Sequence, residues 1–475
     1  MNRTKTISAF LLAAALIVSM VSVQGAGSRS NIDRLVDEKL ASMSVAEKVG
    51  QMTQITLGVL RDDEAQDGKS IDPAKLKEAV HKYHIGSVIN KIGRSLAVDE
   101  WHEVMRKLQD EALSAKNQIP ILYGIDAIHG ANYTVGSTLF PHNIGLGAAR
   151  NPDLVADIAA VTAMEVRASG IRWNFAPVLG LGRNPLWSRF EETYGEDSYL
   201  AGELGAAAVR AYEQDDLASD VAVASCIKHY IGYSNPVSGK DRTPAYIPDI
   251  ELWEHYVSPF AKGVESGAST IMLNSGSVNG MPVHGSKRLL TGLLRDELGF
   301  DGVIVSDWED VIRLHTRHRI AESPHEAVRL AVEAGMDMSM VPFDFSFAEL
   351  LADLVNSGEV SEQRIDESVK RILRLKYELG LFDNAYPERS AAKHFGDPEY
   401  RMLALDAARE TITLLKNEKG ALPLERDTRI LLAGPAAQNL GALHSSWSYT
   451  WQGADESAYP DDTKTIAEAA IEHFG

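Results

Sequence analysis

Eight short β-rich runs that alternate with helical segments constrain the fold of this 475-residue chain more than any other feature. Between the runs, Asn151 followed by Pro152 marks one helix start, and residues 250–265 form another helical stretch. Strands joined by crossover helices pair in parallel, and eight such units make a (β/α)8 barrel. We therefore predict an α/β fold, a (β/α)8 TIM-like barrel, with strands around residue 55 and at 84–90, 119–126, 171–178, 224–230, 270–274, 302–307 and 336–341.

The sequence after the barrel predicts a second, smaller unit. We assign residues 27–382 to the barrel and residues 383–404, which begin with a stretch rich in Pro and polar residues, to a linker. Residues 405–475 then carry one convincing strand at 429–432 and a helix at 465–474. Because one strand cannot bury a complete core, we expect this unit to be the N-terminal part of a truncated α/β sandwich domain.

The first 26 residues have the pattern of a secretory signal peptide. Arg3 and Lys5 precede an apolar run at 9–21, and small residues follow it. The run is too short for a confident membrane span, and no Cys lies near the cleavage point. We expect a secreted or periplasmic protein without a membrane anchor. The single cysteine, Cys226, lies in an apolar run, which predicts a small buried side chain rather than a nucleophile.

The charge of the chain limits the partners that it can bind. Its formal net charge is -19, and phosphate groups of nucleic acids or anionic membranes would be repelled. A neutral substrate fits this charge, and no cofactor is implied. The sequence carries no signal for an oligomeric state.

Charged residues stand at the predicted carboxyl ends of several strands, where barrels of this kind place their chemistry. The most informative string is GFDGVIVSDWED at 299–310, in which an apolar run ends on Asp307 and Trp308. A carboxylate at a strand end suits an ionised nucleophile, and an indole beside it suits the face of a sugar ring. The alternative is that Asp307 caps the following helix. The role of nucleophile is favoured for Asp307, because charged side chains gather at the other strand ends too. These are Asp126, Lys228, His229 and Asp337.

Six strings in order along the chain carry a family resemblance. They are GIDAIHG at 124–130, RNPLWSRFEETYGED at 183–197, KHYIGYSNPVSGKDRTP at 228–244, VSDW at 305–308, LLKNEKGALPL at 414–424 and WSYTWQG at 447–453. Together they make the chain, from about residue 31 to residue 475, resemble the family 3 glycoside hydrolases, in the two-domain exo-β-glucosidase branch that includes β-glucan exohydrolases.

The resemblance implies a retaining β-D-glucosidase that removes terminal non-reducing β-D-glucosyl residues from oligosaccharides. By it, Asp307 forms the covalent glycosyl intermediate and Trp308 packs against the sugar. Sugar hydroxyls need charged donors and acceptors around the ring, and aromatic residues suit its faces. The hydroxyls of the terminal glucose would be bound by Asp126, Arg189, Lys228 and His229. The next subsite would be lined by Arg313 and Trp451, with Trp447 near it.

The chain departs from the family pattern in two places. Ser275 stands where many plant exohydrolases of the family place a Tyr beside the nucleophile. A retaining enzyme also needs a second carboxyl group as acid, and in this branch it is a Glu of the second domain, which we expect beyond residue 475. Glu192 and Glu196 are substitutes by residue type only. The alternative function is therefore a glucoside-binding fragment with little or no hydrolysis.

Three other functions fit parts of the sequence. Lys228 at a strand end is compatible with a Schiff-base lysine, as in aldolases. A metal site is a further alternative, from Asp307, Glu309 and Asp310, whose spacing suits neither regular structure, or from His315 and His318, which lie in a basic, loop-like stretch. The N-acetylglucosaminide-cleaving branch of the family would show a Gly-His-Gly-Asp-Thr run. This chain has GYSNP at 232–236 instead, which disfavours that activity.

Overall fold

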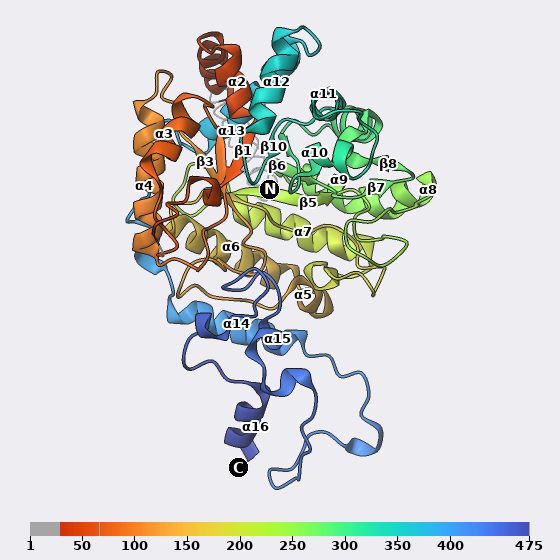
Figure 1. Cartoon of the computed structure of the whole chain (residues 1–475). Coiled ribbons are helices and arrows are strands. Elements are labelled where there is room, and N and C mark those ends of the chain that lie inside the picture. Colours follow the sequence, from red (N-terminus) through yellow and green to blue (C-terminus); the bar gives the residue numbers. More distant parts are fainter. Residues whose placement is uncertain (1–28, 66, 475) are drawn as a thin grey trace, which may run out of the picture.

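Eight parallel strands form a barrel in the computed structural model, which describes residues 29–65 and 67–474. The predicted signal segment lies outside these residues. The strands follow the order β10-β1-β2-β3-β4-β5-β6-β9, and a parallel bridge between Val305 and Met338 closes the circle (Figure 1). This confirms the predicted (β/α)8 fold. The strands are β1 Thr53–Thr56, β2 Ser87–Ile89, β3 Leu122–Ile125, β4 Trp173–Asn174, β5 Ala224–Tyr230, β6 Thr270–Leu273, β9 Val303–Val305 and β10 Ser339–Met340.

The strands are short and buried on both faces, as expected for a parallel barrel covered by helices. Cap signals in the sequence position several of these helices. The Asn151 side chain accepts a hydrogen bond from the backbone of Leu154, and Ser44 with Glu47 forms a capping box. The surrounding helices are α2 Val45–Gln51, α3 Pro73–His81, α4 Val98–Ser114, α5 Asn143–Ala149, α6 Pro152–Ala168, α7 Ser198–Glu213, α8 Asp249–Glu251, α9 Ser258–Glu265, α10 Asp310–Thr316, α11 Pro324–Ala334, α12 Ser346–Asn356 and α13 Glu362–Glu378.

Some segments depart from regular α-helix and strand. The helical stretch expected at 250–265 begins with α8, continues as a π-helix at Leu252–Val257 and ends with α9. A second π-helix spans Arg288–Glu297, and β7 Ser277–Val278 and β8 Met281–Pro282 form a small antiparallel hairpin. Within the described ranges 29–65 and 67–474, no helix has the length and apolar character required to cross a membrane.

The first part of the chain after the barrel lies against one side of it, whereas the loops and the helix nearest the C-terminus extend away from the barrel (Figure 1). Helix α14, Pro398–Thr411, contacts α5 and α6. The helix expected at 465–474 is present as α16, Ile466–Phe474, and α15 spans Leu440–His444. The prediction of a strand at 429–432 is wrong, since that segment is irregular and Leu431 is 92% exposed. No neighbouring strand lies beside this segment among the described residues, so its backbone groups have no ladder to join.

Candidate active site

Most of the residues predicted at strand ends meet at the carboxyl ends of the barrel strands. The placement of Asp337 is wrong, because it precedes β10 and forms ion pairs with Arg295 and Arg371. Asp126 follows β3, and Lys228 and His229 lie near the end of β5. Ser275 follows β6, and Asp307 follows β9. All five side chains are buried. The fold therefore brings together residues that are far apart along the chain, as the barrel prediction requires.

Asp307 is held as a carboxylate by its surroundings. Its Oδ2 accepts a 2.6 Å hydrogen bond from Ser275 Oγ, and its Oδ1 accepts one of 2.6 Å from the backbone N–H of Trp308. Arg242 Nη2 lies 3.8 Å from Oδ1, and His229 Nε2 lies 4.0 Å from Oδ2. Burial raises the pKa of Asp307, but the charge of Arg242, with smaller effects of Arg189 and of the Ser275 hydrogen bond, holds that pKa well below its usual range. The group is therefore ionised at neutral pH.

His284 fixes the backbone of Asp307 from the other side. The Asp307 N–H donates to His284 Nε2 over 3.2 Å, so the neutral imidazole carries its hydrogen on Nδ1. Burial lowers the pKa of His284 to about 3, and the ring is uncharged at neutral pH. Both the side chain and the main chain of the carboxylate are thus held by named partners.

Asp126 and Lys228 form a buried ion pair beside the carboxylate. Lys228 Nζ donates to Asp126 Oδ1 over 2.7 Å. The same ammonium lies 5.4 Å from the ring centroid of Trp447, which comes from the segment after the barrel. This arrangement offers a charged acceptor, a charged donor and an aromatic face at one place, which suits a polyhydroxylated ring.

An irregularity in β5 lets Lys228 and His229 face the same site. Adjacent strand residues normally point to opposite faces. Here the pairing of β5 with β6 shifts register between Ile227 and Tyr230, and the carboxyl end of β5 is no longer regular. His229 Nε2 accepts a 3.1 Å hydrogen bond from Arg189 Nη2. Burial, followed by the charge of Arg189, lowers the pKa of His229 well below its usual value, so the ring is neutral.

Glu192 orients Arg189 and Trp447 and is unsuited to donate a proton. Both of its oxygens accept 2.8 Å hydrogen bonds from Arg189, and Oε1 also accepts one of 2.8 Å from Trp447 Nε1. Burial raises the pKa of Glu192, but Arg189 outweighs it, and the pKa is lower than usual. Glu196 is exposed at the start of α7. Neither substitute acid therefore has the environment of a general acid.

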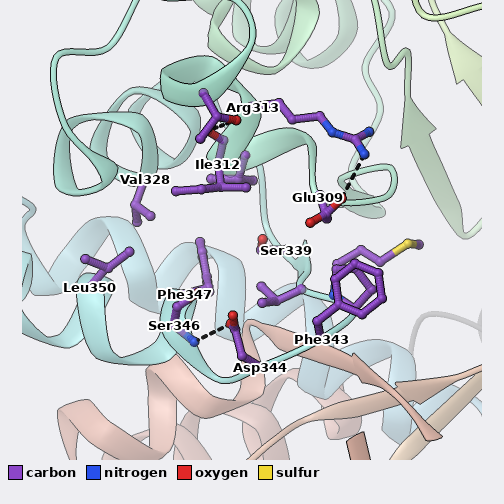
Figure 2. A pocket seen from close by; sticks show the side chains of 15 residues that line it. Glu309, Ile312, Arg313, Val328, Ser339, Phe343, Asp344, Ser346, Phe347 and Leu350 are labelled. Atoms are coloured by element: carbon purple, nitrogen blue, oxygen red, sulfur yellow. Dashed lines mark hydrogen bonds and ion pairs between the residues drawn. The ribbon is translucent and has the colours of Figure 1, made fainter. Parts of the chain in front are cut away.

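Trp308, Arg313 and Trp451 lie further out. Arg313 donates to Trp308 O and to Glu309 Oε2, both over 2.8 Å, and it borders a cavity of about 320 Å³ beside α10 and α12 (Figure 2). Trp308 meets Phe343 of this cavity edge to face, with ring centroids 5.5 Å apart. Trp451 is 59% exposed and pairs with Trp447. Among the described residues, no hydrogen bond, ion pair or ring contact joins Arg313 to Trp451.

Arg242 and Asp310 belong to the site although the sequence analysis gave them no role in catalysis. Arg242 Nη1 donates to Ser275 Oγ over 2.7 Å, and Asp310 also hydrogen-bonds Ser275. Arg242 lies within the 228–244 string, which was the available signal. Asp310 ends the 299–310 string but was given a role only in the metal alternative. Within the part of the chain that the structure describes, no group of three His, Cys, Asp or Glu side chains is placed to hold a metal ion.

Comparison with known protein families identifies the family of this chain. Residues 44–375 match the Glycosyl hydrolase family 3 N terminal domain. The chain belongs to glycosyl hydrolase family 3. Family membership disfavours the aldolase alternative for Lys228, whose ammonium is paired with Asp126.

Relatives in family 3 are longer than this chain. A lysosomal beta glucosidase of Dictyostelium discoideum is 44% identical over 454 residues, which cover 91% of this chain and 55% of that protein. The structure of an exo-1,3/1,4-beta-glucanase from a Pseudoalteromonas species superposes with a TM-score of 0.82 at 32% identity, covering 93% of this chain and 55% of that one. The structure of a beta-glucosidase from Listeria innocua in complex with glucose superposes with a TM-score of 0.80 at 29% identity, covering 93% of this chain and 59% of that one. The chain thus spans about half the length of these relatives.

Proposed function

We propose that this chain forms the barrel of a retaining, exo-acting β-D-glucosidase in which Asp307 is the nucleophile. One observation carries the proposal: Asp307 is a buried carboxylate, held ionised by Arg242 and hydrogen-bonded through both oxygens at the end of β9. A nucleophile needs this combination of charge and fixed orientation. The family 3 relatives named as beta-glucosidases support the same reaction class.

The substrate proposed is a β-glucoside oligosaccharide with its terminal glucose over Asp307. Asp126, Lys228, Arg189 and His229 would bind the hydroxyls of that glucose, and the face of Trp308 would pack against the ring. Arg313 and Trp451 would line the next subsite. The Asp126–Lys228 pair supports this assignment because it provides a charged acceptor and donor side by side.

In the proposed reaction, an Asp307 oxygen attacks the anomeric carbon and the glycosidic oxygen leaves with a proton from a second carboxyl group. Water then hydrolyses the glycosyl ester. Glu192 is occupied by Arg189 and Trp447 and is not that acid. We expect the acid to come from outside the described residues, as the family resemblance implies.

A second candidate is a glucoside-binding protein with weak hydrolysis. The occupied state of Glu192 favours it, because neither Glu192 nor Glu196 has the environment of a general acid. General acid assistance is worth about 10²- to 10⁴-fold. Without this assistance, the rate of hydrolysis would therefore fall most for substrates with poor leaving groups.

Two β-glucosides separate these candidates. Dinitrophenyl β-glucoside needs no acid, whereas cellobiose does. The proposal expects turnover of the aryl glucoside by the wild-type chain, with the β-anomer of glucose as the first product by NMR, and none by Asp307→Asn. Cellobiose turnover would exclude the weak-hydrolysis candidate. An α-anomer first, or equal turnover by Asp307→Asn, would contradict the proposed mechanism.

We also propose a secreted or periplasmic location, on the basis of residues 1–26. A relative named periplasmic beta-glucosidase, from Salmonella typhimurium, is 30% identical over 429 residues and supports the periplasm. N-terminal sequencing of the exported protein tests this, and an uncleaved Met1 would contradict it. The boundaries at 382 and 404, and the reading of 405–475 as part of a larger domain, likewise stay predictions.

A further inference from the structure

The hydroxyl of Ser275 has more acceptors around it than it has hydrogens. Its Oγ lies 2.6 Å from Asp307 Oδ2 and within hydrogen-bond distance of Asp310 Oδ2. The third neighbour, Arg242 Nη1, lies 2.7 Å away and can only donate. A serine hydroxyl has one hydrogen and can serve one carboxylate. The other carboxylate is left facing an oxygen lone pair.

A single additional proton removes this conflict. If both carboxyl groups were ionised, one short oxygen-to-oxygen contact in a buried site would contain no hydrogen, which is costly. With a proton on one carboxyl, each of the three contacts at Ser275 Oγ contains one hydrogen. The hydroxyl then accepts two hydrogen bonds and donates one, which is its full capacity.

The surroundings favour Asp310 as the holder of this proton. Asp307 has the Trp308 N–H on its other oxygen, as well as the nearby Arg242. Asp310 is 1% exposed, and its Oδ1 accepts one 3.2 Å hydrogen bond from Arg313 Nη1, a donor that this carboxyl shares with Trp308 O at the shorter distance of 2.8 Å.

The charges around the pair act in the same direction. Burial, followed by the negative charge of Asp307, raises the pKa of Asp310 to about 7. Arg242, whose Nη1 lies 3.6 Å from Asp310 Oδ2, and Arg313 oppose this shift but do not cancel it. His229 and His284 face Asp307 as neutral rings. The two carboxyls thus have pKa values displaced in opposite directions from their usual range.

We propose that Asp310 is protonated and donates to Ser275, whose hydroxyl hydrogen points at Asp307 and orients it. Asp310 is therefore a positioning residue for the nucleophile, and Ser275 transmits its effect. The inference deepens the proposed function, since it rests on Asp307 as the nucleophile. Loss of the Asp310 proton as pH rises places a second negative charge against Asp307 and leaves Ser275 with two competing acceptors.

Infrared difference spectroscopy on the substrate-free protein tests the proton directly. We expect a protonated-carboxyl C=O band that disappears as pH rises through about 7 and is missing from Asp310→Asn. Glu213→Gln is the matched control, because burial raises the pKa of Glu213 to about 7 at a distant site. The control should lose a different band and keep that of Asp310. Identical pH-difference spectra for the wild-type chain and Asp310→Asn would overturn the proposal.

Ser275→Ala guards against a misfolded Asp310→Asn variant. Removing the hydroxyl takes away the acceptor of the Asp310 proton, so the C=O band should shift in frequency. An unshifted band would overturn the assigned chain of hydrogen bonds. Neither spectrum requires turnover, so a failure of the proposed glucosidase activity would leave these results interpretable.

Trapping kinetics test the positioning role. The reagent is a dinitrophenyl 2-fluoro-β-glucoside, which leaves without an acid. The side-chain amide introduced by Asp310→Asn can donate to Ser275 as the acid does. At about pH 6 the trapping rate of this variant should therefore stay within about threefold of the wild-type rate. The rate of Asp310→Ala should fall about tenfold or more, because its side chain cannot donate. The wild-type rate should change as pH passes about 7, and the Asp310→Asn rate should not. Equal losses in both variants would mean that the carboxylate charge is required, which would overturn the proposal.

Discussion

Arg189 and Glu192 face each other through two hydrogen bonds of 2.8 Å, one from Nε and one from Nη2. The same carboxylate accepts a hydrogen bond from Trp447 Nε1, so this ion pair connects the barrel with the segment that follows it. The position of the arginine and that of the indole are therefore set by one carboxylate. A change at Glu192 should disturb both.

Glu192→Gln should destabilise the protein and weaken glucose binding. The amide keeps one acceptor oxygen but leaves the buried Arg189 charge without a counter-ion, which we expect to cost about 2 to 3 kcal/mol. Calorimetry would show a lower unfolding temperature. The matched control is Glu196→Gln, since Glu196 is exposed nearby. Equal unfolding temperatures for the two variants would show that the ion pair contributes little.

Lys228→Met should weaken sugar binding and also lower the stability of the fold, because it leaves Asp126 as a buried unpaired charge. The Met side chain fills a similar volume but removes a charged donor and leaves Asp126 unpaired. A hydrogen bond to a charged group is worth roughly 1.5 to 3 kcal/mol, so the Kd for glucose should rise about 10- to 100-fold. Isothermal titration measures it, with the exposed Lys240→Met as control. An unchanged Kd in Lys228→Met would remove Lys228 from the binding site.

Arg242→Gln should move the acid limb of the trapping reaction to higher pH. Asp307 reacts only when ionised, and Arg242 is the strongest of the groups that lower its pKa. In the wild-type chain the rate should therefore persist as pH falls through the usual carboxylate range, near ~4. In Arg242→Gln, the loss of this opposite charge should move the midpoint of the acid limb to a pH about 1 to 3 units higher.

The control for this experiment is Arg106→Gln, an exposed arginine on α4. Its profile should match that of the wild-type chain. A limb at the same pH in Arg242→Gln and in the control would contradict the role given to Arg242.

The barrel could be predicted from the sequence because short β-rich runs alternate with helical segments, and several of these runs end at a recognisable polar residue. Asp307 and Asp126 could be placed for the same reason. Arg242 could not, because its contact with Ser275 depends on the course of an irregular loop. The shared orientation of Lys228 and His229 contradicts simple strand alternation and arises from the register shift in β5.

The predicted strand at 429–432 failed for a different physical reason. The apolar run at 429–432 does have β-propensity, but a strand also needs a neighbouring strand to pair with its backbone groups. Leu431 and its neighbours are instead exposed. Tertiary context decided this segment, and no local pattern contains that information.

Limited proteolysis should cut the chain first between residues 412 and 438. This segment has only short helical turns and exposes Leu414, Leu415 and Leu431. Exposed, irregular backbone is the preferred substrate of proteases. Thermolysin digestion followed by mass spectrometry should yield a stable fragment that ends near Thr411. First cuts inside the barrel helices would contradict this picture.

The central claim is that Asp307 is the nucleophile, and a trapped intermediate tests it most directly. The protein is incubated with the dinitrophenyl 2-fluoro-β-glucoside, and its intact mass and peptide map are recorded. We predict one fluoroglucosyl adduct on the peptide that contains Asp307, and none in Asp307→Asn. An adduct on a different carboxylate, or no adduct on folded wild-type protein, would contradict it.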